Sequence, residues 1–95
     1  MELRHLRYFI AVARHGSTLA AARTLGTSQT TVARRIAALE QALGIPLFEK
    51  RQAGYALTPA GEELLGKARK VEDSAEAFAE AASARTRDLT GNVRI

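Results

Sequence analysis

The sequence predicts a mainly α-helical protein with three short helices, a short β-hairpin and one long final helix. Apolar residues recur every three or four positions over most of the chain, which is the period of a helix that buries one face. Glycines and prolines interrupt this pattern at a few points and divide it into segments. With 95 residues, the chain is long enough for one compact domain and too short for two ordinary ones.

The first two helices are indicated by an apolar stripe and by two glycines. The stripe of the first helix has i, i+3, i+4, i+7 spacing and consists of Leu6, Phe9, Ile10 and Ala13. We expect this helix to end at His15-Gly16. Ser17 then stands where a helix N-cap belongs, and residues 19–25 form an alanine-rich second helix that ends at Gly26.

The third helix begins after Thr27 and Ser28, of which Ser28 is the better N-cap. Its buried stripe is expected to consist of Val32, Ile36, Leu39 and Leu43. Gly44 ends this helix, and Pro46 prevents its continuation because proline lacks the backbone N–H that a helix interior needs.

Residues 47–58 lack the helical period and indicate a β-hairpin, with Gly54 between two short pieces, residues 47–50 and 55–58. The long helix begins at Thr58-Pro59, a capping hydroxyl followed by proline at the first helical position. Helical composition continues to about residue 89, so roughly 30 residues would form a rod about 45 Å long. Residues 90–95 are interpreted as a hinge: a linker followed by the first residues of a strand.

The long helix carries a heptad seam, in which apolar residues are spaced alternately four and three positions apart. The seam consists of Leu64, Ala68, Val71, Ala75, Phe78 and Ala82. It could pair with a second long helix or pack on the chain's own head. Because a small helical head cannot cover a rod of this length, we expect the seam to form a homodimer. A small core that is marginal by itself also favours a partner subunit.

Positive charge is concentrated in the first part of the chain. Residues 1–58 contain eight Lys and Arg against three acidic residues, a net charge of +5, whereas residues 59–95 contain six against seven. A basic domain attracts polyanions such as nucleic acid, although charge alone fits an ordinary basic surface equally well.

Composition and motifs exclude several other classes of protein. The chain has no cysteine, and His5 and His15 are too isolated to predict a metal site. Paired carboxylates, a nucleophile–base pair and a phosphate loop are all missing, so we expect no enzyme activity and no cofactor. Neither a secretory signal nor a run of ~20 apolar residues is present. We therefore expect a soluble, cytoplasmic protein that does not contact a membrane.

Two short helices joined by residues 26–28 have the form of a helix-turn-helix. The major groove of DNA, about 12 Å wide, admits one helix, and the first turns of that helix reach the bases. Short polar and cationic side chains suit those turns, and here they are Gln29, Thr30, Thr31, Arg34 and Arg35. An ordinary polar surface helix is the alternative. Arg35 lies about 100° round the helix from Arg34, so it would contact a phosphate or pair with Glu40 or Glu49.

Several further motifs occur in order over nearly the whole chain. They are LRYF-x-AVA at residues 6–13, the pair Ala21-Ala22, the pair Ser28-Gln29, ALEQALG with LFEK at residues 38–50, and LTPAGE at residues 57–62. Together they resemble the N-terminal DNA-binding domain of bacterial LysR-type transcriptional regulators. The resemblance implies a winged helix-turn-helix in residues 1–58, a linker and dimerisation helix in residues 59–89, and a hinge in residues 90–95.

The resemblance also implies roles for the residues at matching positions. Residues 28–43 would lie in the major groove of an imperfect palindromic operator in double-stranded DNA, and the hairpin would form a wing on the DNA backbone or in the minor groove. The long helix would pair antiparallel with that of a second copy, and a small-molecule effector would act only through a further domain. The expected DNA contacts are Ser17, Thr18, Ser28, Gln29, Thr30, Thr31, Arg34, Arg35, Lys50, Arg51 and Gln52.

The chain departs from the family pattern at four positions. Many members have an aromatic residue, a proline, a serine and a basic residue where this chain has Thr18, Thr30, Ala33 and Ala53. The first three departures affect which operator sequence the protein is expected to recognise. Ala53 weakens the expectation that the wing enters the minor groove. The alternative from another class of protein is a coiled-coil adaptor whose basic head binds acidic proteins. Such an adaptor would not need short polar side chains at the start of the third helix.

Overall fold

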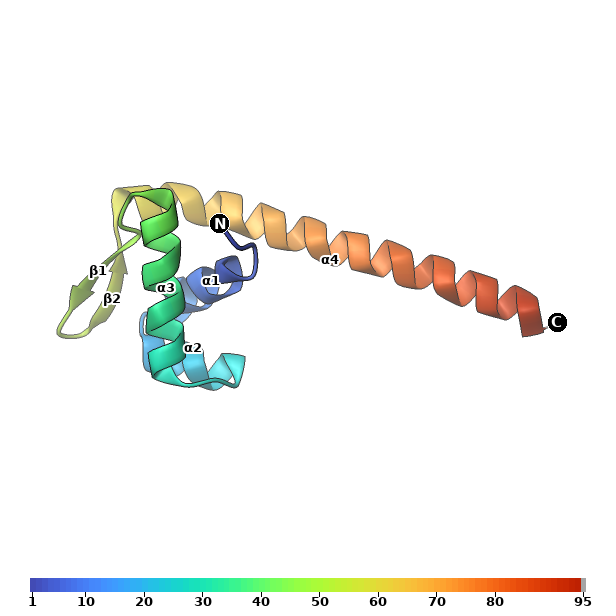
Figure 1. Ribbon diagram of the computed structural model, residues 1–95, viewed down its shortest axis with the longest axis horizontal. Helices are drawn as coiled ribbons and strands as arrows, with labels where there is room; N and C mark the ends of the chain where they lie inside the picture. Colours follow the sequence, from blue (N-terminus) through green and yellow to red (C-terminus); the bar gives the residue numbers. More distant parts are fainter. Residues whose placement is uncertain (95) are drawn as a thin grey trace.

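The computed structural model describes the backbone of residues 1–94 and the side chains of residues 1–88. Three helices and a hairpin form a head, from which one long helix extends as a rod (Figure 1). In chain order the elements are α1 (His5–His15), α2 (Thr18–Leu25), α3 (Gln29–Leu43), β1 (Phe48–Arg51), β2 (Gly54–Leu57) and α4 (Pro59–Arg94). The fold class predicted from the sequence, a winged helix-turn-helix followed by a long helix, is confirmed.

Local capping explains where α2 and α3 begin and where all three short helices end. The Ser17 side chain accepts a hydrogen bond from the backbone N–H of Ala20 at 3.0 Å, and Ser28 does the same for Thr31 at 3.1 Å. These bonds satisfy N–H groups that have no partner inside the helix. Each of the first three helices ends at a glycine in the left-handed conformation, as the sequence predicted.

The core of the head lies where the three helices meet the base of the hairpin. The Phe48 ring packs edge-on against Phe9 of α1 and against Tyr55 of β2, with ring centroids 5.6 and 5.7 Å apart. Most residues of the predicted stripes of α1 and α3 are buried, but Ala13 is only partly buried against the core. Leu43 is 39% exposed, because the last turn of α3 borders an apolar groove of about 170 Å³ between α1 and α4.

The hairpin pairs antiparallel from Phe48↔Leu57 to Arg51↔Gly54. Gln52 and Ala53 form the turn, so the predicted strands were each misplaced by one residue, and Gly54 begins β2 instead of lying in the connection. At the base of the hairpin, the Glu40 carboxylate accepts hydrogen bonds from the backbone N–H groups of Leu47 at 2.7 Å and Phe48 at 3.1 Å. This carboxylate therefore fastens α3 to the start of the wing.

Thr58 joins the hairpin to the rod. Its hydroxyl donates a hydrogen bond to the carbonyl oxygen of Pro46 at 2.8 Å and accepts one from the N–H of Gly61 at 3.0 Å. The predicted start of α4 is confirmed, but its predicted end near residue 89 is wrong, since helix continues to Arg94. The backbone of residues 90–94 is therefore helical, where the sequence predicted a hinge and the start of a strand. Gly91 costs a helix only about 1 kcal/mol, and residues 90–95 contain no proline that would end it. Ile95 lies outside the described residues.

The heptad seam of α4 divides into two parts. Leu64 packs against the core of the head and Ala68 is 4% exposed within it, because the first turns of α4 run across α1. Beyond them Val71 is 41% and Phe78 77% exposed. The sequence interpretation of one continuous dimer seam therefore needs correction for Leu64 and Ala68, whose side chains are occupied within the chain. None of the helices in residues 1–94 is long and apolar enough to cross a bilayer.

Candidate nucleic-acid interface

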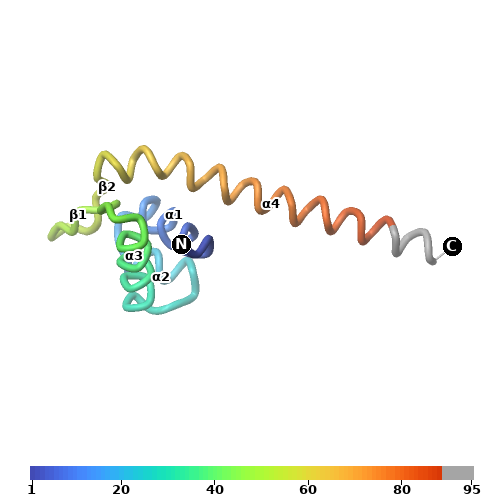
Figure 2. The backbone as a smooth tube through the Cα atoms, turned by 45° about the horizontal axis from the view of Figure 1, so that its top comes forward, coloured from blue at the N-terminus to red at the C-terminus, as the bar shows by residue number. Residues whose placement is uncertain are grey.

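The N-terminal turns of α3 lie at the end of the head that is farthest from the rod. In Figures 1 and 2 the last turn of α3 reaches up to the start of α4, whereas its first turn lies beside α2 at the opposite end. The rod does not cross over these first turns. They are therefore open to a large partner approaching the head from that side.

The apolar stripe of α3 determines which of its side chains face outward. Val32, Ile36 and Leu39 are buried in the head. The opposite face presents polar side chains: Gln29, Thr30 and Arg34 are exposed, while Thr31 is half-buried. The sequence therefore predicted the phase of this helix correctly. Five of the expected DNA-contacting residues lie on its first two turns, namely Gln29, Thr30, Thr31, Arg34 and Arg35.

Two hydrogen-bonded pairs order the polar groups at the start of α3. The Ser28 hydroxyl donates to the Thr31 hydroxyl at 2.9 Å, while it also caps the helix. Beside it, the Gln29 side-chain amide donates from Nε2 to the hydroxyl oxygen of Thr18 on α2 at 3.1 Å. Side chains on both helices of the helix-turn-helix thus contribute to one polar surface.

The two arginines of α3 differ in their surroundings. Arg34 is exposed, and no acidic side chain in residues 1–88 lies within ion-pair distance of it. Arg35 is half-buried, and its Nε atom is buried without a hydrogen-bond partner. The alternative of an ion pair between Arg35 and Glu40 or Glu49 is wrong, because Glu40 binds the base of the hairpin and Glu49 pairs with Arg51.

The start of α2 offers less to a phosphate than the sequence suggested. Ser17 is half-buried and its hydroxyl caps the helix. Thr18 is only 4% exposed, and its hydroxyl accepts the Gln29 amide. The structure therefore does not place the Thr18 hydroxyl at the surface, where the expected phosphate contact would need it.

The wing carries three exposed polar side chains that the sequence singled out, namely Lys50, Arg51 and Gln52. Arg51 forms an ion pair with Glu49 at 2.8 Å, but more than half of each side chain is exposed. Exposed pairs of this kind contribute at most about 1 kcal/mol, so Arg51 can exchange Glu49 for another anion. The backbone N–H of Tyr55 donates to the carbonyl oxygen of Gly16 at 2.9 Å, which joins the wing to the turn between α1 and α2.

Comparison with protein families identifies the chain. Residues 3–62 match the model of "Bacterial regulatory helix-turn-helix protein, lysR family". The chain belongs to the LysR family. Over all of its 95 residues it is 45% identical to the HTH-type transcriptional regulator ClcR of Pseudomonas putida and 43% identical to the HTH-type transcriptional regulator BudR of Klebsiella aerogenes. It spans 32% of the length of the first and 66% of the second.

Solved structures of LysR-family DNA-binding domains have the same fold. A CbnR_DBD-DNA complex has a TM-score of 0.84 and 41% identity, over 90% of this chain and 99% of that one. The BenM_DBD/catB site 1 DNA complex has a TM-score of 0.85 and 36% identity, over 88% and 94% of the two chains. The family resemblance inferred from the sequence motifs is therefore confirmed.

Three contacts of this LysR-family head were not foreseen from the sequence. They are the bonds between Thr18 and Gln29, between Glu40 and the base of the hairpin, and between Gly16 and Tyr55. Only the first left a usable signal, which is a polar residue at a position where many family members have an aromatic one. The other two have a backbone group on at least one side, and the sequence does not show which backbone group a distant residue will meet.

Proposed function

We propose that the chain binds double-stranded DNA sequence-specifically, as the operator-recognition part of a LysR-type transcriptional regulator. In this proposal α3 enters the major groove and the wing contacts the backbone or the minor groove. One observation carries the proposal: the exposed first turns of α3 present Gln29, Thr30 and Arg34 at the end of the head opposite the rod. Groove reading requires polar side chains on an accessible helix start.

The chemistry of these side chains suits base edges. A glutamine amide can bond adenine through one donor and one acceptor, and an arginine can bond the two acceptors of guanine. Threonine adds a hydroxyl and a methyl group, which fits the thymine methyl. On the wing, Lys50 and Arg51 supply cations for phosphates, and the bond between Tyr55 and Gly16 attaches the wing to the head. Such contacts with phosphate position the protein, whereas base contacts select the sequence.

The relatives support regulation over catalysis. Those compared above are named as transcriptional regulators, and two of the similar solved structures are described as DNA complexes. We infer that this chain acts in the bacterial cytoplasm as a regulator without enzyme activity. Its effector would act through a further domain of a longer protein. This agrees with the length of ClcR, of which the chain spans 32%.

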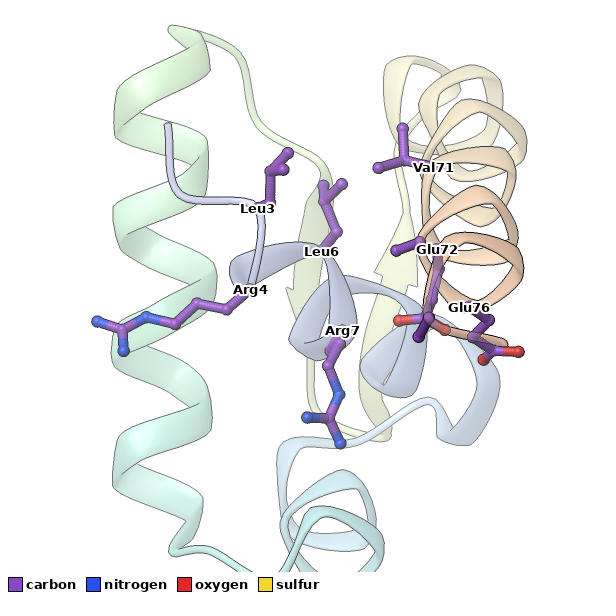
Figure 3. A pocket seen from close by; sticks show the side chains of 9 residues that line it. Leu3, Arg4, Leu6, Arg7, Val71, Glu72 and Glu76 are labelled. Atoms are coloured by element: carbon purple, nitrogen blue, oxygen red, sulfur yellow. The ribbon is translucent and has the colours of Figure 1, made fainter. Parts of the chain in front are cut away.

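Dimerisation through α4 is part of the proposal. A groove of about 580 Å³ runs between the N-terminal segment with α1 and the middle of α4. Figure 3 shows Leu3 and Leu6 on one side of this groove and Val71, Glu72 and Glu76 on the other. Val71 and Ala75 of this groove also belong to the exposed part of the seam, which consists of Val71, Ala75, Phe78 and Ala82. An exposed apolar surface of this extent favours a protein partner, and a second α4 has the matching seam.

Selection of bound duplexes from a random library tests the DNA-binding proposal. We expect a sequence with twofold symmetry, whose half-sites lie about one helical turn of DNA or a multiple of it apart. Competition with heparin is the control for charge alone. If no common sequence is recovered, or if heparin displaces the selected duplex as easily as it displaces an unrelated one, the head is merely basic and the proposal is wrong.

A further inference from the structure

A single side-chain hydrogen bond links the two helices of the helix-turn-helix at the reading surface. It runs from Nε2 of Gln29, the first residue of α3, to Oγ1 of Thr18, the first residue of α2, at 3.1 Å. We propose that Thr18 is a positioning residue, which orients the Gln29 amide so that it selects adenine over guanine. This inference rests on the proposed function, because it concerns the base that the same surface reads.

Thr18 is suited to holding another side chain in place. It is only 4% exposed, and a β-branched side chain in a helix has few rotamers. The helix on which it stands is capped immediately before it by Ser17, whose hydroxyl binds the N–H of Ala20. The Thr18 hydroxyl oxygen is therefore a fixed acceptor at the base of an otherwise exposed residue.

Gln29 needs such an anchor because its side chain is long and exposed. Glutamine is among the residues with the largest rotamer entropy, so a free side chain loses much of this entropy when it binds a base. A bond that already exists in the free protein removes part of that cost. Thr18 thus acts on Gln29 before any DNA is present.

The direction of the bond also fixes which atoms of the amide remain available. A glutamine amide has two N–H groups and one carbonyl oxygen. Donation of one N–H to Thr18 leaves one N–H and the oxygen Oε1. Adenine offers an acceptor at N7 and a donor at N6, which match this pair of groups, whereas guanine offers two acceptors, at N7 and O6. An anchored amide would place Oε1 against guanine O6, while an unanchored amide could turn to avoid that repulsion.

The proposal is tested first in the free protein by NMR of the Gln29 side-chain amide in the 95-residue chain. We expect an ordered Nε2 group in the wild type and in T18S, which keeps the hydroxyl, and a mobile one in T18V. T24V is the matched control on the same helix, because the Thr24 hydroxyl is 3.0 Å from His15 Nε2 and does not contact α3. An equally ordered Gln29 amide in T18V would overturn the anchoring role.

The second test is the base preference of each variant in a selection from random duplexes. Q29A identifies the base pair that Gln29 reads, and a Q29A selection identical to that of the wild type would overturn the reading role. At that base pair we expect T18V to reduce the preference for adenine over guanine about 3- to 10-fold, the range for one neutral hydrogen bond. T18S and T24V should keep the wild-type preference, and adding T18V to Q29A should change nothing more.

The outcomes separate this inference from the proposed function. A wild-type chain that recovers no common sequence would overturn DNA reading altogether. A wild-type chain that recovers an adenine-containing half-site, together with a T18V variant of the same preference, would overturn only the role of Thr18. Thermal unfolding of every variant accompanies the selections. If T18V does not fold, T18A removes the same hydroxyl with a smaller side chain and takes its place.

Discussion

The backbone N–H of Tyr55, in the second strand of the wing, donates a hydrogen bond to the carbonyl oxygen of Gly16, in the turn between α1 and α2, at 2.9 Å. The backbones of these two segments approach closely because the residue before Tyr55 is Gly54, with a φ of 136°. A Cβ atom at Gly54 would overlap the Gly16 oxygen. The wing is therefore attached to the helix-turn-helix by this close backbone contact.

Replacing Gly54 with alanine tests this attachment. The methyl group meets backbone at Gly16 and also strains a φ that side chains rarely adopt, so we expect the free energy of unfolding to fall by about 1–3 kcal/mol. For a domain of this size, each kcal/mol corresponds to a melting temperature lower by about 4–8 °C. Circular dichroism during heating measures the change.

Gly66→Ala is the matched control for this glycine. Gly66 lies inside α4, and an added Cβ there meets nothing within 4 Å. Alanine at this position should raise the free energy of unfolding by about 0.5–1 kcal/mol, because alanine loses less backbone entropy in a helix than glycine. If both substitutions stabilise the protein, the close approach of wing and turn has been misjudged.

Glu40 makes a second attachment, between α3 and the base of the wing. Glu40→Ala leaves the N–H groups of Leu47 and Phe48 without their acceptor, and we expect a loss of about 1–3 kcal/mol in the free energy of unfolding. Glu40→Gln keeps an acceptor oxygen and should lose less. Gln41→Ala changes an exposed position on the same helix and should stay within about 0.5 kcal/mol of the wild type. Equal denaturation midpoints for Glu40→Ala and Gln41→Ala would contradict the stabilising attachment through Glu40.

The sequence predicted those features of the fold that depend on neighbouring residues. The caps at Ser17, Ser28 and Thr58 were recognised because a capping hydroxyl binds an N–H only three residues ahead. The phase of α3 followed from the spacing of its buried stripe. The end of α4 was missed, because the weak helix formers after residue 89 lower helix stability without forbidding helix.

Contacts between distant residues could not be predicted in this way. Heptad spacing identified one face of α4 but not what covers it. In the structure Ala68 is buried against the head, whereas Phe78 is exposed. Similarly, the sequence placed Thr18 and Gln29 at the starts of two helices, but their separation of 11 residues says nothing about whether the side chains meet. Which residues approach each other depends on how the helices pack, and spacing within one helix does not determine that.

Arg34 is expected to contribute directly to DNA binding. Arg34→Ala should weaken binding to the selected duplex by about 1–3 kcal/mol, because an exposed arginine on the second turn of α3 is within reach of guanine or phosphate. Arg87→Ala removes the same charge from an exposed position far along α4 and controls for the long-range field. Fluorescence anisotropy at several salt concentrations measures both variants. Equal affinities and equal salt dependence for the two would remove Arg34 from the interface.

Phe78 tests whether the rod is the dimer contact. Phe78 is 77% exposed in the single chain, and burying such a side chain against a partner contributes about 1.5–3 kcal/mol. Phe78→Glu forfeits that contribution and places an unpaired charge in the seam, so we expect the dimer dissociation constant to rise at least about 30-fold. Ala77→Glu adds the same charge about 100° round the helix, beside the seam, and should leave the dimer intact. Analytical ultracentrifugation distinguishes the two variants. A Phe78→Glu chain that still sediments as a dimer would mean that the subunits pair through another surface, and the spacing of operator half-sites would then have to be derived from that surface.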